Sequence, residues 1–99
     1  MDIPDKVSIG GQMLEVIQPN EIEGGKLGQC CVAAGYIKIA DTFNGKKQSG
    51  SSKENTFWHE VTHAILDTMG RGDLNEDESF VCCFSGFLTE CINSIEKKK

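Results

Sequence analysis

The sequence lacks the features that mark several large classes of protein. No segment approaches the roughly 18 consecutive apolar residues of a membrane span, and residues 1–6 contain no basic stretch that leads into an apolar run, as a secretory signal would. Positive charge is also scarce, because 10 basic side chains stand against 15 acidic ones, and the one cluster of lysines lies at residues 97–99. We therefore expect a cytoplasmic protein whose partner is neither a membrane nor a nucleic acid.

A C-x-x-C spacing, typical of cysteine-rich zinc sites, is missing as well, although the chain has five cysteines. Four of them form two adjacent pairs, Cys30 with Cys31 and Cys82 with Cys83, and neighbours in sequence rarely bridge each other. We predict reduced thiols. Cys83 and Cys91 lie among phenylalanines, where a free cysteine behaves as a small apolar side chain, so we expect them to be packed.

The first half of the chain predicts a small sheet. Residues 7–18 alternate partly between apolar and polar and contain the pair Gly10-Gly11, which indicates a β-hairpin. Residues 29–34 and 35–40 are rich in β-forming side chains and indicate two further strands. With 99 residues, the chain is long enough for one small domain, so we expect a single α+β domain with a small, mostly antiparallel sheet.

The second half predicts two helices, over about residues 52–69 and 75–95. Capping-box spacing is present at Ser51 with Glu54 and at Asn75 with Glu78. Helical periodicity predicts an apolar face on each helix. The first face comprises Trp58, Val61, Ile65 and Met69, and the second comprises Phe80, Phe84, Phe87, Leu88, Cys91 and Ile95.

The first predicted helix contains both histidines of the protein in the pattern His59-Glu60-x-x-His63. Residues four apart lie on one face of a helix, so the two imidazoles can converge on one metal ion. Glu60 lies about 100° round the helix from His59, where it can reach a metal-bound water without binding the metal. Two imidazoles suit zinc, so this segment predicts a zinc site.

Two histidines hold zinc weakly, and catalytic sites of this kind normally add a carboxylate. Glu76, Asp77 and Glu78 all follow His63 closely enough to serve, because the second helix must fold back across the first. All three acids could instead stabilise the start of the second helix, where a negative side chain interacts favourably with the helix dipole. Glu78 could also form the capping box with Asn75. The spacing alone leaves the third ligand open among them.

Three stretches carry a resemblance to a known family. They are Ile-Lys-Ile-Ala-Asp at residues 37–41, Trp-His-Glu-Val-Thr-His-Ala-Ile-Leu at 58–66, and Glu-Ser-Phe-Val at 78–81 with the apolar residues that follow. Over about residues 28–92 the chain resembles small gluzincin-type zinc metallopeptidases, in particular short phage and prophage proteins related to the ImmA/IrrE-like and SprT-like zincins.

The resemblance implies a minimal zincin-like domain that hydrolyses peptide bonds in a peptide or protein substrate, in the host cytoplasm if the protein is phage-encoded. Its zinc would be bound by His59, His63 and Glu78, with Glu60 as the general base. We expect the substrate to lie extended along a strand edge near residues 36–40. Asp67, one turn beyond His63, is either an outer partner of an imidazole or a surface acid.

The donor that would stabilise the oxyanion is missing from the pattern. After the motif the chain has no His, Tyr or Arg apart from Arg71, and Tyr36 could serve only if its strand faced the cleft. An alternative hypothesis is therefore a catalytically weak or inactive zincin-fold protein that acts through protein–protein interaction. A third is a helix and sheet domain that binds no metal.

Overall fold

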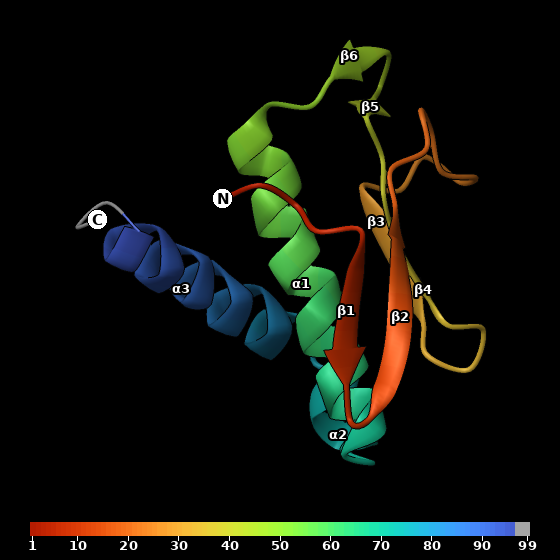
Figure 1. The fold of residues 1–99 in the computed structure, drawn as a ribbon, viewed down its shortest axis with the longest axis vertical. Coiled ribbons are helices and arrows are strands. Elements are labelled where there is room, and N and C mark those ends of the chain that lie inside the picture. The colour runs from red at the N-terminus through yellow and green to blue at the C-terminus, as the bar shows by residue number, and fades with distance from the viewer. Residues whose placement is uncertain (97–99) are drawn as a thin grey trace.

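The computed structural model describes residues 1–96, which form an α+β fold with a four-stranded sheet followed by helices (Figure 1). The elements are β1 (Lys6–Ile9), β2 (Gln12–Ile17), β3 (Gly28–Cys31), β4 (Tyr36–Ile39), β5 (Thr42–Phe43), β6 (Lys46–Lys47), α1 (Gly50–Thr68), α2 (Gly72–Asn75) and α3 (Glu78–Glu96). Over residues 1–96, no helix is both long and apolar enough to cross a membrane.

The sheet is mixed and has the strand order β1-β2-β4-β3. The β1–β2 and β3–β4 pairs are antiparallel hairpins, as predicted, whereas β2 and β4 run parallel. Gly10 and Gly11 form the first turn with φ values of 61° and 82°, a conformation that glycine adopts without steric cost. β4 therefore lies inside the sheet and β3 forms an edge, so the expected free edge at residues 36–40 is wrong.

Helix α1 begins two residues earlier than predicted, because Ser49 caps it. The Ser49 hydroxyl accepts a hydrogen bond from the backbone N–H of Ser52 at 3.1 Å. The capping box predicted at Ser51 and Glu54 is absent. Glu54 is buried instead, and its carboxylate accepts from the α-amino group of Met1 at 3.2 Å.

One face of α1 packs on the sheet and sets the position of the site (Figure 1). Phe57, Val61 and Ala64 provide this contact, because positions 57, 61 and 64 follow the helical period and all three side chains are buried. The stripe predicted on α1 is partly wrong, since Ile65 is exposed and Met69 is 63 % exposed. The core cluster is Ile9, Leu14, Val16, Ile37, Ile39, Phe57, Val61 and Ala64.

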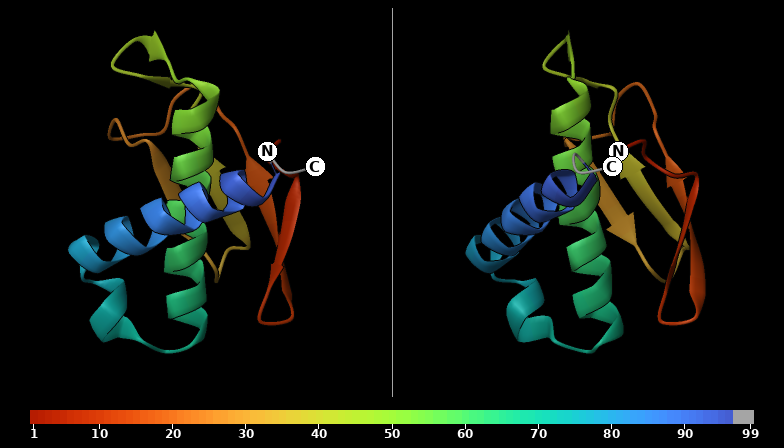
Figure 2. Two further views of the ribbon diagram at one scale, coloured as in Figure 1. Left: turned by 90° about the vertical axis from the view of Figure 1, so that its left-hand side faces the viewer. Right: turned by 60° about the vertical axis from the view of Figure 1, so that its left-hand side comes forward.

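Helix α3 crosses α1 on the side away from the sheet (Figure 2). It is turned differently from the prediction: Val81, Ser85 and Thr89 are buried, whereas Phe87 is 72 % exposed. Small side chains allow two crossing helices to approach closely, and the Thr89 hydroxyl is satisfied by donating to the carbonyl of Ser85 at 2.7 Å. Exposed residues of the predicted face also include Phe84, Cys91 and Ile95, and Cys83 is exposed with them.

The second capping box is also wrong. Asn75 ends the short helix α2, and α3 begins three residues later with Asp77 as its cap, whose carboxylate accepts from the N–H of Phe80 at 3.1 Å. Asn75 and Glu78 are thereby free to turn towards α1. All five cysteines are free thiols, as expected.

Candidate metal centre

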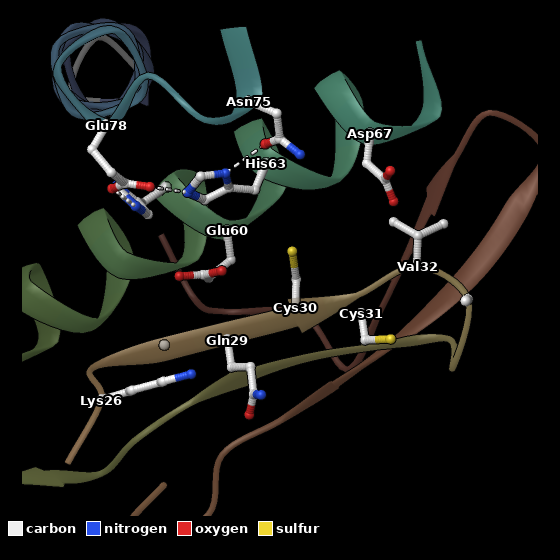
Figure 3. A pocket seen from close by; sticks show the side chains of 13 residues that line it. Lys26, Gln29, Cys30, Cys31, Val32, Glu60, His63, Asp67, Asn75 and Glu78 are labelled. Atoms are coloured by element: carbon white, nitrogen blue, oxygen red, sulfur yellow. Dashed lines mark hydrogen bonds and ion pairs between the residues drawn. The ribbon is translucent and has the colours of Figure 1, made fainter. Parts of the chain in front are cut away.

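The chain reversal after α1 brings Glu78 against both histidines of the motif, and Figure 3 shows its carboxylate facing His63. Nε2 of His63 lies 2.9 Å from Oε1 of Glu78, and Nε2 of His59 lies 3.4 Å from Oε2 of the same carboxylate. The two imidazole centroids are 4.9 Å apart. One carboxylate from the first turn of α3 therefore contacts a nitrogen of each histidine in one turn of α1. Among the described residues, the group whose donor atoms all lie within 4.8 Å of one another is His59, Glu78 and Cys82.

The donor set fits zinc. Zinc bonds of about 2.0–2.2 Å to nitrogen and oxygen, arranged as a tetrahedron, separate neighbouring ligand atoms by about 3.3–3.5 Å. The separations of 2.9 and 3.4 Å between the nitrogens and the carboxylate oxygens are close to this value. Two neutral imidazoles with a carboxylate are also the donor chemistry of many catalytic zinc sites.

The other two candidate acids are turned elsewhere. Asp77 uses its carboxylate to cap α3, and neither Asp77 nor Glu76 lines the cleft between β3 and α1. Of the three acids that sequence spacing left open, Glu78 is the one whose carboxylate reaches both imidazoles.

Asn75 orients His63. Nδ1 of His63 lies 2.6 Å from Oδ1 of Asn75, an atom that only accepts, so Nδ1 carries the proton and Nε2 presents its lone pair to Glu78. A lone pair facing a carboxylate is favourable only with a cation or proton between them. Asp67, considered from the sequence as an orienting group, lines the cleft but does not contact His63. Spacing suggested only a helix cap for Asn75, because its contact depends on the chain reversal.

The surroundings of His59 favour the neutral form of its ring, which metal binding requires. Its burial lowers the pKa, the neighbouring charge of His63 lowers it further, and Glu78 partly opposes both effects. On its other side, Nδ1 of His59 lies 3.9 Å from the sulfur of Cys82 on α3.

Glu60 points into the cleft from α1, and its carboxylate lies outside the contact between His63 and Glu78 (Figure 3). Its side chain is largely enclosed, and the whole residue is 7 % exposed. Burial raises the pKa of its carboxyl group and the charge of Glu78 adds to this, while His63 and a hydrogen bond from Cys30 oppose the shift. A carboxylate with a raised pKa is a stronger base, as proton abstraction near neutral pH requires.

Strand β3 closes the other side of the cleft, and two of its residues act on Glu60. Gly28 lies so close to α1 that a Cβ on it would be 2.6 Å from Cγ2 of Thr56 and 2.9 Å from Oε2 of Glu60. Cys30 lies opposite Glu60. Burial raises the pKa of the Cys30 thiol to about 12, and the negative charge of Glu60 adds to this effect. Sequence patterns indicated neither role, since both depend on how β3 packs against α1.

The cleft has a volume of about 760 Å³ and is open to solvent. Among the described residues that line it, Lys26 is the one with a cationic side chain other than histidine, and it precedes β3. Tyr36 and Arg71, the two oxyanion donors considered from the sequence, do not line the cleft. Arg71 instead forms an exposed two-point ion pair with Asp73.

No protein-family model, curated protein or solved structure matches the chain. The resemblance to small gluzincins therefore depends on the short stretches of sequence alone, and the function has to follow from the chemistry of the cleft.

Proposed function

We propose that the protein is a zinc-dependent peptidase whose metal is bound by His59, His63 and Glu78. The observation that supports this most strongly is the convergence of both Nε2 atoms on the two oxygens of one carboxylate. Three protein ligands leave a fourth tetrahedral position for water, which is the arrangement of catalytic zinc sites. When bound there, zinc would supply a Lewis acid that lowers the pKa of that water and polarises a substrate carbonyl.

Glu60 performs the proton transfers in this proposal. Its carboxylate takes a proton from the attacking water and later delivers it to the departing amine, and its raised pKa suits both tasks. Asn75 keeps His63 in the tautomer that presents Nε2, and Gly28 leaves the space that the Glu60 side chain occupies. Each role belongs to a side chain whose place is determined by the packing of α1 against β3 or α2.

The edge strand β3 is the surface on which a peptide would bind. Its free edge lies along the cleft opposite the histidines, so an extended peptide can add to it as a further strand through backbone hydrogen bonds. Lys26 would bring an ammonium group to the negative charge that develops on the carbonyl oxygen, the role for which the sequence offered no donor after the motif.

The test is the variant Glu60→Gln, which keeps the shape of the side chain and removes the base. We expect loss of cleavage of a mixture of unstructured peptides, followed by mass spectrometry, with one zinc per chain retained. Glu76→Gln, on an exposed residue outside the cleft, serves as the matched control and should cleave like the wild type. Full activity of Glu60→Gln would refute the mechanism.

A second function is supported by the exposed apolar side chains of α3. Phe84, Phe87 and Ile95 lie on the surface, as side chains at protein–protein contacts often do. In this alternative the protein is a non-catalytic binding protein whose metal stabilises the fold. Removal of zinc by a chelator would then unfold the chain, and Glu60→Gln would bind its partner as well as the wild type does.

A further inference from the structure

A fourth side chain with metal-binding chemistry lies at the same centre. Cys82 follows Glu78 by four residues on α3, so both side chains lie on one face of that helix. A ring nitrogen of His59, a carboxylate oxygen of Glu78 and the sulfur of Cys82 all lie within 4.8 Å of one another. The centre thus has two pairs of donors at i, i+4 spacing on two crossing helices, His59 with His63 and Glu78 with Cys82.

We propose that the thiolate of Cys82 is the fourth ligand of the metal and closes the centre against water in the resting protein. This inference rests on the proposed zinc site of His59, His63 and Glu78 and adds its regulation. It goes beyond the motif, which accounts for the two histidines and Glu60 but not for a cysteine on α3.

Cys82 lies beside the centre, and its ligation requires a movement of the sulfur. Zinc bonds of about 2.3 Å to sulfur and 2.0 Å to nitrogen separate the two ligand atoms of a tetrahedron by about 3.5 Å. The sulfur lies 3.9 Å from Nδ1 of His59, the ring nitrogen next to the one that faces Glu78, and within 4.8 Å of a carboxylate oxygen of Glu78. To bind the metal, the sulfur must move past the edge of the imidazole to the Nε2 side. Cys82 is exposed, which leaves its Cα–Cβ bond free to turn the sulfur towards the position between the Nε2 atoms and Glu78.

Charge also favours a thiolate at this position. Two neutral imidazoles and one carboxylate leave a net charge of +1 on a zinc complex that is partly buried, and a thiolate cancels it. Cys30, the other cysteine near Glu60, is a poor candidate because its buried thiol has a pKa of about 12 and donates to Glu60.

Four protein ligands make a closed tetrahedral site, which is the structural type, whereas three ligands and a water make the catalytic type. With Cys82 bound, Glu60 has no metal-bound water from which to take a proton. The centre is therefore inactive while the Cys82 sulfur is bound, and it becomes active when the sulfur leaves and water takes its position. Removal of this sulfur should weaken metal binding by at least about tenfold, the lower end of the loss seen when partners of metal ligands are removed.

The experiment loads the full chain with cobalt(II) in place of zinc and records its absorption spectrum. A cobalt–thiolate bond produces a charge-transfer band in the near ultraviolet, whereas nitrogen and oxygen ligands produce only the weaker visible bands. We expect one cobalt per chain and the charge-transfer band in the wild type. Cys82→Ser should lose the band and keep the visible bands of the remaining ligands. Cys83→Ser, at the neighbouring exposed cysteine about 100° round α3, should leave both unchanged.

The outcomes separate this inference from the proposed function. Visible bands without a charge-transfer band in the wild type would overturn ligation by Cys82 and leave the three-ligand site intact. A charge-transfer band that persists in Cys82→Ser would also overturn it, because another thiol would then be the ligand. If no cobalt binds to the wild type, both the inference and the proposed zinc site are wrong.

Discussion

The variant Gly28→Ala tests whether the packing of β3 against α1 positions the general base. The added methyl group would lie 2.6 Å from Cγ2 of Thr56 and 2.9 and 3.0 Å from Oε2 and Cγ of Glu60. Thr56 is buried, and Glu60 can yield only by moving its carboxylate further into the cleft, away from its present position. Overpacking of this kind costs about 1–3 kcal/mol of unfolding free energy, and displacement of a reacting group by about 1 Å can lower activity by about 100-fold.

Urea unfolding measures the effect of Gly28→Ala on stability, and peptide cleavage measures its effect on activity. We expect lower stability and lower activity with zinc still bound, because the atoms nearest to the new methyl group belong to Thr56 and Glu60 and not to the proposed ligands. The matched control is Gly86→Ala in α3, where no atom lies within 4 Å of the new Cβ. That variant should be more stable by up to about 1 kcal/mol, since alanine favours a helix over glycine. A Gly28→Ala protein as stable and as active as the wild type would refute the reasoning.

Three further predictions concern the surroundings of the site. Asn75→Ala should weaken zinc binding by about 10- to 100-fold in a calorimetric titration, whereas Asp67→Ala should not. Equal effects of the two variants would contradict the assignment of Asn75 as the group that orients the imidazole of His63. Cys30 should resist alkylation by iodoacetamide at pH 8, because a thiol pKa of about 12 leaves about one thiolate in 10,000 molecules. The exposed Cys83 should react. Similar alkylation rates for the two cysteines, measured by mass spectrometry, would refute the burial of Cys30. Phe87→Ser should change the free energy of urea unfolding by less than about 0.5 kcal/mol, since the ring is 72 % exposed, and a loss of several kcal/mol would show that it is packed.

Sequence patterns within a few neighbouring residues predicted those elements whose structure depends on neighbouring residues. Gly10-Gly11 requires positive φ values that suit a tight hairpin turn, and the observed β1–β2 pair has this turn. The motif helix follows from its periodicity and a nearby serine cap, with an error of two residues at its start. The strand order did not follow, because the parallel pairing of β2 with β4 is a contact between distant segments that no turn residue specifies.

Helix α3 shows where periodicity is insufficient. Its phenylalanines form a more apolar face than Val81, Ser85 and Thr89, so a hydrophobic pattern selects the wrong side. The buried side is selected by shape, since small side chains let α3 cross α1 closely, and by the hydroxyl groups that bond to carbonyls of their own helix.

The site was predictable to a similar depth. The closeness of His59, Glu60 and His63 could be predicted because their spacing within one helix places them in adjacent positions. Glu78 could be listed but not distinguished from its neighbours by spacing. Asn75 could not be assigned to His63, because its contact arises where the chain reverses between α1 and α3.

The central claim is that His59, His63 and Glu78 bind one zinc ion, and elemental analysis of the purified chain tests it most directly. We expect one zinc per chain in the wild type, loss of zinc in His63→Ala and Glu78→Ala, and full retention in Glu76→Ala, whose side chain lies outside the cleft. A wild-type protein without zinc, or a Glu78→Ala protein that retains it as firmly as the wild type, would contradict the account.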